Sequence, residues 1–241
     1  MELNRGFQIY LKDIRRGIFN KAVVIMIVSS IVGAAAIKLR LPAILEAGAG
    51  TDLIISSVFR LLLVYYGVNH FGCDYFTNSA RLIYSVQEER LVIYGCKILA
   101  NMTTAVYLAA VHILLKLTVP NLAGSISAVR EIWTIMGVYM IFSTVVIVFS
   151  MTLSLIIKSS SFILIADYFL FFWSFGDNLA MLGKNTKLGF LQSLLTHNTF
   201  YELGRAFTAL QIDRFTIKST IPFILVFGVA GAVLLKQKDI A

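Results

Sequence analysis

The sequence has little charge and few cysteines or prolines. Of its 241 residues only 14% are Asp, Glu, Lys or Arg, whereas 58% are hydrophobic. Soluble domains carry about 25% charged residues, so this composition excludes a water-soluble globular protein. The two cysteines, Cys73 and Cys96, form neither a CxxC pair nor a cluster of metal ligands. We expect both to be reduced thiols with a structural role.

Motifs that bind nucleotides or support catalysis are also missing from the sequence. It contains no GxxxxGK[ST] phosphate loop, so we expect no ATP site of that kind in this chain. It also contains no HExxH, no GxSxG and no cluster of His or Cys ligands. Glu88, Glu89 and Arg90 resemble part of an intramembrane protease motif, but the arginine is adjacent to the glutamates instead of one helical turn away. We therefore expect no enzyme activity and no metal or cofactor bound by this chain.

Long apolar runs make up most of the sequence, and its mean hydropathy is +0.82. Runs of roughly 17–25 apolar residues can cross about 30 Å of hydrocarbon as helices, in which all backbone groups are hydrogen-bonded. The sequence therefore predicts an all-α membrane protein that forms a single domain over residues 1–241. The six spans are expected at about 18–37, 53–72, 98–116, 132–157, 162–176 and 216–235.

The N-terminal residues show helical periodicity before the first span. Within 3–19, Phe7, Leu11, Ile14 and Ile18 recur at helical spacing, and the basic residues fall on other faces. This pattern is typical of an amphipathic helix that lies in the headgroup plane with its apolar side toward the hydrocarbon. A charged extension of the first span is the alternative.

The fifth predicted span is short, and a long semi-apolar region follows it. Residues 162–176 provide only about 15 residues, fewer than a straight crossing needs. In the region 177–215, Phe200, Leu203 and Phe207 again fall at helical spacing. We expect one or two half-helices in this region, which dip into the outer leaflet or lie on it and pack against protein.

Positive charges set the expected orientation. The net charge is +8, and basic residues are concentrated before the first span. Lys and Arg next to spans favour the cytoplasmic side, where they meet anionic lipid. We therefore expect a multi-pass protein of the cell (cytoplasmic) membrane with both termini in the cytoplasm. The same argument accounts for the basic balance without a nucleic-acid partner.

A charged segment at 71–97 separates the second and third predicted spans. It is too long for a turn, and it holds Asp74, Arg81, Glu88, Glu89, Arg90 and Lys97. A helix at the cytoplasmic face could present these charges to a soluble partner. Tyr75, Phe76, Leu82 and Tyr84 could supply the buried anchors that such an interface needs. An ordinary solvated loop is the alternative.

The sequence of this segment resembles that of a segment in a known family of membrane proteins. The pattern Phe71…Asp74-Tyr75…Asn78-Ser79-Ala80-Arg81…Arg90…Lys97 resembles the segment between spans two and three of ABC-2-type transporter permeases. That family commonly has Glu-Tyr and Gly-Thr-x-Arg at the corresponding positions. Here Asp replaces Glu, Asn-Ser replaces Gly-Thr, and the usual proline before the second arginine is absent. The amphipathic N-terminal helix, the membrane-dipping helices before the last span and the basic-Asp ending also resemble this family.

The resemblance implies the permease subunit of an exporter, with a coupling helix between spans two and three. Its partners would be a second permease subunit, identical or paralogous, and a separate cytoplasmic ABC ATPase that binds ATP and Mg²⁺. The cargo would be hydrophobic or amphipathic, a peptide first and a lipid or small antibiotic second. The coupling residues would be Asp74, Tyr75, Phe76, Arg81, Leu82, Tyr84, Glu88, Glu89 and Arg90. A non-transporting immunity or anchor protein and a secondary transporter that uses Asp167 are the alternatives.

Several polar residues fall inside predicted spans, namely Arg60, His70, His112 and Asp167. Such residues are costly in hydrocarbon and face protein or a wet cavity. They could pair for structural reasons, or they could act on substrate or in gating. By depth along the helices, His70 is the expected partner of Asp167.

Overall fold

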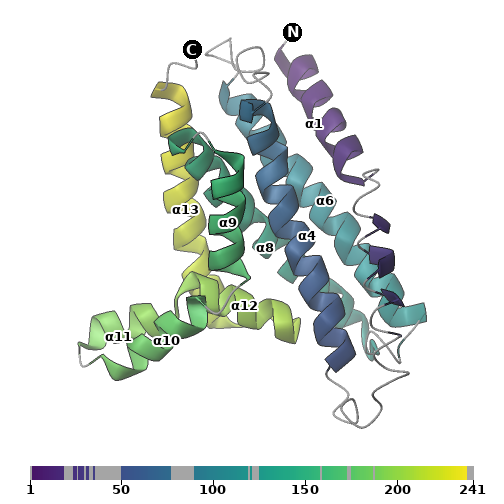
Figure 1. Ribbon diagram of the computed structural model, residues 1–241, viewed down its shortest axis with the longest axis vertical. Coiled ribbons are helices and arrows are strands. Elements are labelled where there is room, and N and C mark those ends of the chain that lie inside the picture. Colours follow the sequence, from purple (N-terminus) through teal and green to yellow (C-terminus); the bar gives the residue numbers. More distant parts are fainter. Residues whose placement is uncertain are drawn as a thin grey trace.

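All regular structure in the described part of the chain is helical (Figure 1). The computed structural model describes residues 2–18, 50–76, 90–118, 120, 125–157, 159–172, 175–186 and 188–237, and a few positions between 24 and 35. No strand occurs among these residues. The expectation of an all-α protein is thus confirmed for them.

Long helices standing side by side form the body of the molecule, and shorter helices lie across its lower part in the view (Figure 1). In chain order they are α1 (Glu2–Ile18), α4 (Gly50–Phe76), α6 (Arg90–Thr118), α8 (Val129–Ile156), α9 (Ser160–Phe171), α10 (Phe175–Asn185), α11 (Gly189–Thr196), α12 (Thr199–Ala209) and α13 (Arg214–Gln237). The first turn of α1 and the last turn of α13 lie at the same end of the bundle. The ends of α4 and α6 that border residues 77–89 lie there too (Figure 1).

Three of the described helices, α6, α8 and α13, are long and apolar enough to cross a membrane. A fourth candidate span is a broken one, in which Ser161–Phe171 and Phe175–Asn185 meet at an angle of 49°. Helix α4 contributes a shorter apolar stretch, Ile55–Asn69. These helices indicate a membrane protein. The predicted first span lies largely outside the described residues, so the number of six spans stays a prediction.

Several helix boundaries differ from those of the predicted spans. Helix α4 continues to Phe76 and α6 begins at Arg90, so the predicted coupling segment 71–97 includes the end of α4 and the start of α6. We call the residues between these helices, 77–89, the bridge. The fifth apolar helix ends at Phe171 instead of residue 176. The region after it holds α10, α11 and α12, more helices than the one or two half-helices expected.

Helix α8 lies at the centre of the fold and packs against α4, α6, α9 and α13. Tyr139, Phe142 and Val146 on this helix are fully buried. A Cβ added at Gly67 of α4 would lie 2.5 Å from Cγ1 of Val146, so only glycine allows the two helices to approach this closely. The central helix therefore fixes the position of α4.

Hydrogen bonds between helices satisfy polar side chains in this apolar interior. Asn101 Nδ2 donates to the carbonyl oxygen and to the hydroxyl oxygen of Ser143, at 3.1 and 2.6 Å. His112 Nδ1 lies 2.7 Å from the hydroxyl oxygen of Tyr139. Because polar groups are costly in hydrocarbon, such pairs tie α6 to α8 at defined positions.

Helix α1 packs along α6 and is the amphipathic helix that the sequence predicts. Phe7 and Leu11 on its apolar stripe are about half exposed, at 55% and 48%, whereas Asp13 is buried against α6. The apolar stripe thus points away from the bundle and is free to meet lipid. Its placement in the headgroup plane stays a prediction.

Candidate functional site

The predicted coupling segment lies mostly outside the described residues. This is so for Arg81, Leu82, Tyr84, Glu88 and Glu89. Asp74, Tyr75 and Phe76 lie in the last turns of α4, where only the backbone is described. Arg90, the first residue of α6, is the predicted coupling residue whose side chain is described.

The Arg90 side chain points into the protein. It is 8% exposed, and its Nη1 donates to the carbonyl oxygen of Leu235, 3.2 Å away in the last turn of α13. The last carbonyls of a helix have no partner within the helix, and a cation close to them is stabilising. Arg90 therefore links the residue that follows the bridge 77–89 to the C-terminal helix. Its contact with an ATPase stays a prediction.

Lys97, two turns further along α6, links the bridge region to α1. Its Nζ lies 3.0 Å from Oδ2 of Asp13, and the two side chains are 0% and 5% exposed. A buried ion pair of this kind is stabilising only while both charges are present, because their mutual attraction offsets the cost of taking each charge out of water. The start of α6 is thus bonded to both terminal helices of the chain.

A second group of polar residues surrounds Arg60 in α4, where α9 ends and α10 begins. The Arg60 guanidinium donates to the carbonyl oxygen of Phe171, the last residue of α9. The guanidinium also lies 5.7 Å from the ring centres of Phe142 and Phe172, a cation–π distance. A break in an apolar helix frees carbonyl groups that lipid cannot satisfy. Arg60 therefore stabilises the end of α9 at the break.

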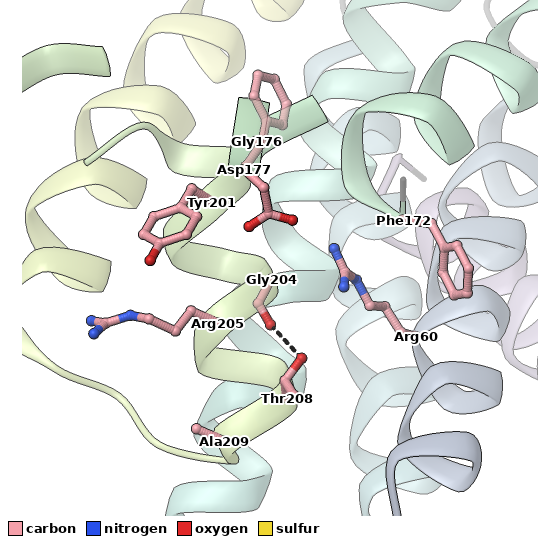
Figure 2. Close-up of a pocket in the computed structure, with 10 residues that line it drawn as sticks. Arg60, Phe172, Gly176, Asp177, Tyr201, Gly204, Arg205, Thr208 and Ala209 are labelled. Carbon is pink, nitrogen blue, oxygen red and sulfur yellow. Dashed lines mark hydrogen bonds between the residues drawn. The ribbon is translucent and has the colours of Figure 1, made fainter. Parts of the chain in front are cut away.

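A cavity of about 380 Å³ opens beside Arg60 (Figure 2). Its walls come from α4, α10 and α12 and from the end of α9. Figure 2 shows Arg60 and Asp177 on facing sides of it, with Tyr201 and Arg205 along α12. Its lining residues are Arg60, Phe172, Gly176, Asp177, Phe200, Tyr201, Gly204, Arg205, Thr208 and Ala209.

Two glycines allow the helices around this cavity to approach closely. A Cβ at Gly176 would lie 2.4 Å from the backbone nitrogen of Tyr201, so α10 and α12 are in backbone contact there. A Cβ at Gly204 would lie 3.1 Å from a terminal nitrogen of Arg60. Backbone packing at Gly176 therefore holds α10 against α12, and at Gly204 the Arg60 guanidinium lies close to α12 because that residue has no side chain.

The other predicted intramembrane residues do not join this cavity. His112 lies against Tyr139 and stacks on Phe59, with ring centres 5.0 Å apart. Asp167 in α9 is fully buried and accepts a hydrogen bond from the Ser150 hydroxyl of α8. The side chain of His70 is outside the described ones, so the predicted contact between Asp167 and His70 stays a prediction.

Comparison with known proteins adds no identification. No family model matches this sequence, and no curated protein matches it significantly. The resemblance to ABC-2-type permeases therefore rests on the residues quoted above.

Sequence reasoning missed an ionic network that runs along α12, from His197 before the helix to Asp213 after it. Glu202 is buried, with its Oε1 2.7 Å from His197 Nδ1 and its Oε2 3.0 Å from a terminal nitrogen of Arg205. Arg205 also pairs with Asp213. The spacing of Glu202 and Arg205, three residues apart on a helix, was the signal that could have revealed the first pair.

The network ends at a helix cap. Asp213 Oδ1 accepts hydrogen bonds from the backbone nitrogen and the hydroxyl of Thr216, at 2.8 and 2.9 Å. These bonds, the backbone one foremost, and the nearby Arg205 lower the pKa of Asp213 below its ordinary value of 3.8. Asp213 therefore stabilises the start of α13 as a carboxylate.

Proposed function

We propose that this chain is the permease subunit of an ABC-type exporter, driven by a separate ATPase that docks on the bridge 77–89. It would pair with a second permease subunit and move a hydrophobic or amphipathic cargo, a peptide first, out of the cell. ATP and Mg²⁺ would be bound by the ATPase subunit. The observation that carries this proposal is the buried bonding of the start of α6, directly after the bridge, to α13 and α1.

Through these bonds, a displacement of the bridge would move the helices of the bundle. The first contact, between Arg90 and Leu235, is immediate to the bridge, and the second, between Lys97 and Asp13, lies about 10 Å further along α6 by helical rise. Helix α6 also packs along α8 through the bonds of Asn101 with Ser143. A push on the bridge would thus reach four helices through contacts that are buried and oriented. An ordinary solvated loop needs no such anchoring.

Co-purification with an ATPase tests the proposal. The chain is co-expressed with an ABC ATPase subunit from the same genome, and the retained ATPase and its ATP hydrolysis are measured. We expect Arg81→Glu to lower the retained ATPase at least about tenfold, as loss of an interface hot spot does, with expression unchanged. Arg130→Glu, an exposed arginine at the opposite end of the bundle, is the matched control. An ATPase that is never retained, or is retained equally by Arg81→Glu, would refute the proposal.

A secondary transporter coupled to protons is the second candidate. The observation in its favour is Asp167, whose Oδ1 is buried and has no hydrogen-bond partner in the described part of the chain. Buried carboxylates in membrane helices serve as proton sites in transporters. This candidate predicts cargo flux driven by a pH gradient without nucleotide, and loss of that flux in Asp167→Asn. Flux that requires nucleotide would exclude it.

A further inference from the structure

We propose that the cavity beside Arg60 binds a zwitterionic head group, an anionic phosphate or carboxylate with an ammonium group a few ångströms away. The volume of about 380 Å³ lies at the small end of the roughly 300–1,000 Å³ of small-molecule sites. It suits the head of an amphiphile. The proposal does not depend on the exporter function, because a head group can bind here whether or not it is cargo.

Polar groups of the cavity have bonding capacity that the protein leaves unused. Arg60 Nε is buried and has no hydrogen-bond partner among the described residues. The Asp177 carboxylate interacts with Arg60 electrostatically but makes no hydrogen bond or ion pair within the described chain. Buried polar groups in proteins are almost always hydrogen-bonded, so an unused donor beside a cavity indicates a missing acceptor.

The two charge signs are separated across the cavity. Arg60 from α4 and Asp177 from α10 face each other, whereas Arg205 points from α12 away from Arg60 (Figure 2). The Arg205 guanidinium is paired with Glu202 and Asp213. An anionic group against Arg60 would accept from Arg60 Nε. An ammonium group would then reach Asp177. The Thr208 hydroxyl already donates to the carbonyl oxygen of Gly204, 2.9 Å away, so it can only accept from the ligand. This arrangement complements a zwitterion better than a simple anion, which Asp177 would repel.

Apolar walls complete the site. Phe172 and Phe200 line the cavity beside the charged residues. A ligand with a polar head and apolar chains could therefore bind with its head against Arg60 and its chains toward lipid. Phosphatidylethanolamine has this chemistry. The water-soluble head group alone, phosphoethanolamine, is the other source of the same zwitterion.

Lipid retention tests this inference on the purified full-length chain in detergent. Phosphatidylethanolamine and phosphatidylglycerol are added at equal concentration, and the retained lipid is measured by native mass spectrometry. We expect preferential retention of phosphatidylethanolamine, lowered about tenfold in Arg60→Gln because a charge-assisted hydrogen bond is lost. Asp177→Asn should remove the preference between the two lipids while leaving binding of phosphatidylglycerol. Arg214→Gln, an exposed arginine that does not line this cavity, is the control and should bind as the wild type does.

Arg60→Gln could disturb the helix break between α9 and α10. The Asp177→Asn variant then still tests the proposal. This substitution leaves the bond between Arg60 and Phe171 at the helix break in place. Competition with soluble phosphoethanolamine separates the two sources: displacement means that the head group suffices, and no displacement means that the chains contribute. Either result agrees with the site. Equal retention of both lipids by the wild type, or a preference unchanged in Asp177→Asn, would overturn it.

Discussion

The ion pair between Lys97 and Asp13 shows what a single charge does inside this bundle. Both side chains are almost completely buried, with 3.0 Å between Nζ and Oδ2. Taking two charges out of water is costly, and their attraction offsets this only while both remain. The net value of such a pair over two apolar residues is therefore small. The cost of removing one partner is large.

This asymmetry predicts the outcome of a double-mutant cycle. Asp13→Leu and Lys97→Met should each lower the free energy of unfolding by about 3 kcal/mol, because each removes the attraction that offsets the cost of burying the remaining charge. The double variant should lose much less than the sum of the two. Thermal unfolding in detergent measures all three, and Lys12→Met, at the exposed lysine beside Asp13, should change little. Additive losses would mean that the two side chains do not interact.

The sequence placed Asp167 and His112 against protein, whereas its one predicted pairing, of Asp167 with His70, stays a prediction. Asp167 and His112 are fully buried, as their cost in hydrocarbon requires. The depth of a residue in the membrane can be counted along a helix from the sequence, and this depth suggested His70 as the partner of Asp167. The direction in which a side chain points around the helix depends on how neighbouring helices pack. That packing brings Ser150 of α8 to Asp167.

At the scale of helices, close contact between α10 and α12 depends on Gly176. A methyl group there would meet the backbone of Phe200 and Tyr201 at 2.8 and 2.4 Å, and backbone atoms cannot move aside as a side chain can. We expect Gly176→Ala to destabilise the protein by about 1–3 kcal/mol, as overpacking does, and to weaken binding in the Arg60 cavity. Thermal unfolding and lipid retention are the measurements.

A second glycine provides the matched control. At Gly95 in α6, a Cβ would meet nothing within 4 Å. Gly95→Ala should therefore leave stability unchanged or raise it by up to about 1 kcal/mol, the helix propensity difference between the two residues. Equal losses in both variants would show that the contact between α10 and α12 is not what requires Gly176.

The stability of the first turn of α13 should depend on pH because of the Asp213 carboxyl. The folded-state pKa of this carboxyl is lowered, so its stabilisation is fully present above the unfolded pKa and is lost as the pH falls through the lowered folded-state pKa. Asp213→Ala should remove about 1 kcal/mol of capping at neutral pH. Asp213→Asn should keep the cap, because asparagine also accepts from the backbone, but lose the pH dependence. Hydrogen exchange in the first turn of α13 measures this. Protection that is independent of pH in the wild type would contradict it.

Helix boundaries were the least predictable part of the fold. Hydropathy locates apolar runs, but α4 and α6 continue past the runs into the charged segment 71–97, because polar residues also form helix. In the region 177–215 the breaks depend on caps. The Asn198 side chain accepts from the backbone nitrogen of Tyr201 at 2.9 Å and starts α12 there. At the other end Leu210 adopts a left-handed backbone, with φ of 50°, and ends the helix.

At the scale of the whole molecule, the ends of the helices give a geometric constraint on function. The bridge 77–89 is bordered by helix ends that lie beside the last turn of α13 (Figure 1). The turn between α8 and α9 lies at this end too, since α8 runs from the opposite end. Whichever side of the membrane holds the last turn of α13 therefore also holds the helix ends that border the bridge. Docking of a cytoplasmic ATPase requires that side to be the cytoplasm.

Cysteine labelling on intact cells tests this orientation. In a background with Cys73 and Cys96 replaced by serine, single cysteines are placed at the exposed positions Ser125, before α8, and Gln237, at the end of α13. A membrane-impermeant maleimide should label Ser125→Cys in intact cells and Gln237→Cys only after the membrane is opened. Ser159→Cys, in the turn between α8 and α9, should behave as Gln237→Cys does, which makes it the internal control. The reverse pattern would place the bridge outside the cell, where no ATP-driven subunit could reach it, and the exporter proposal would fail while the head-group site beside Arg60 would remain open to its own test.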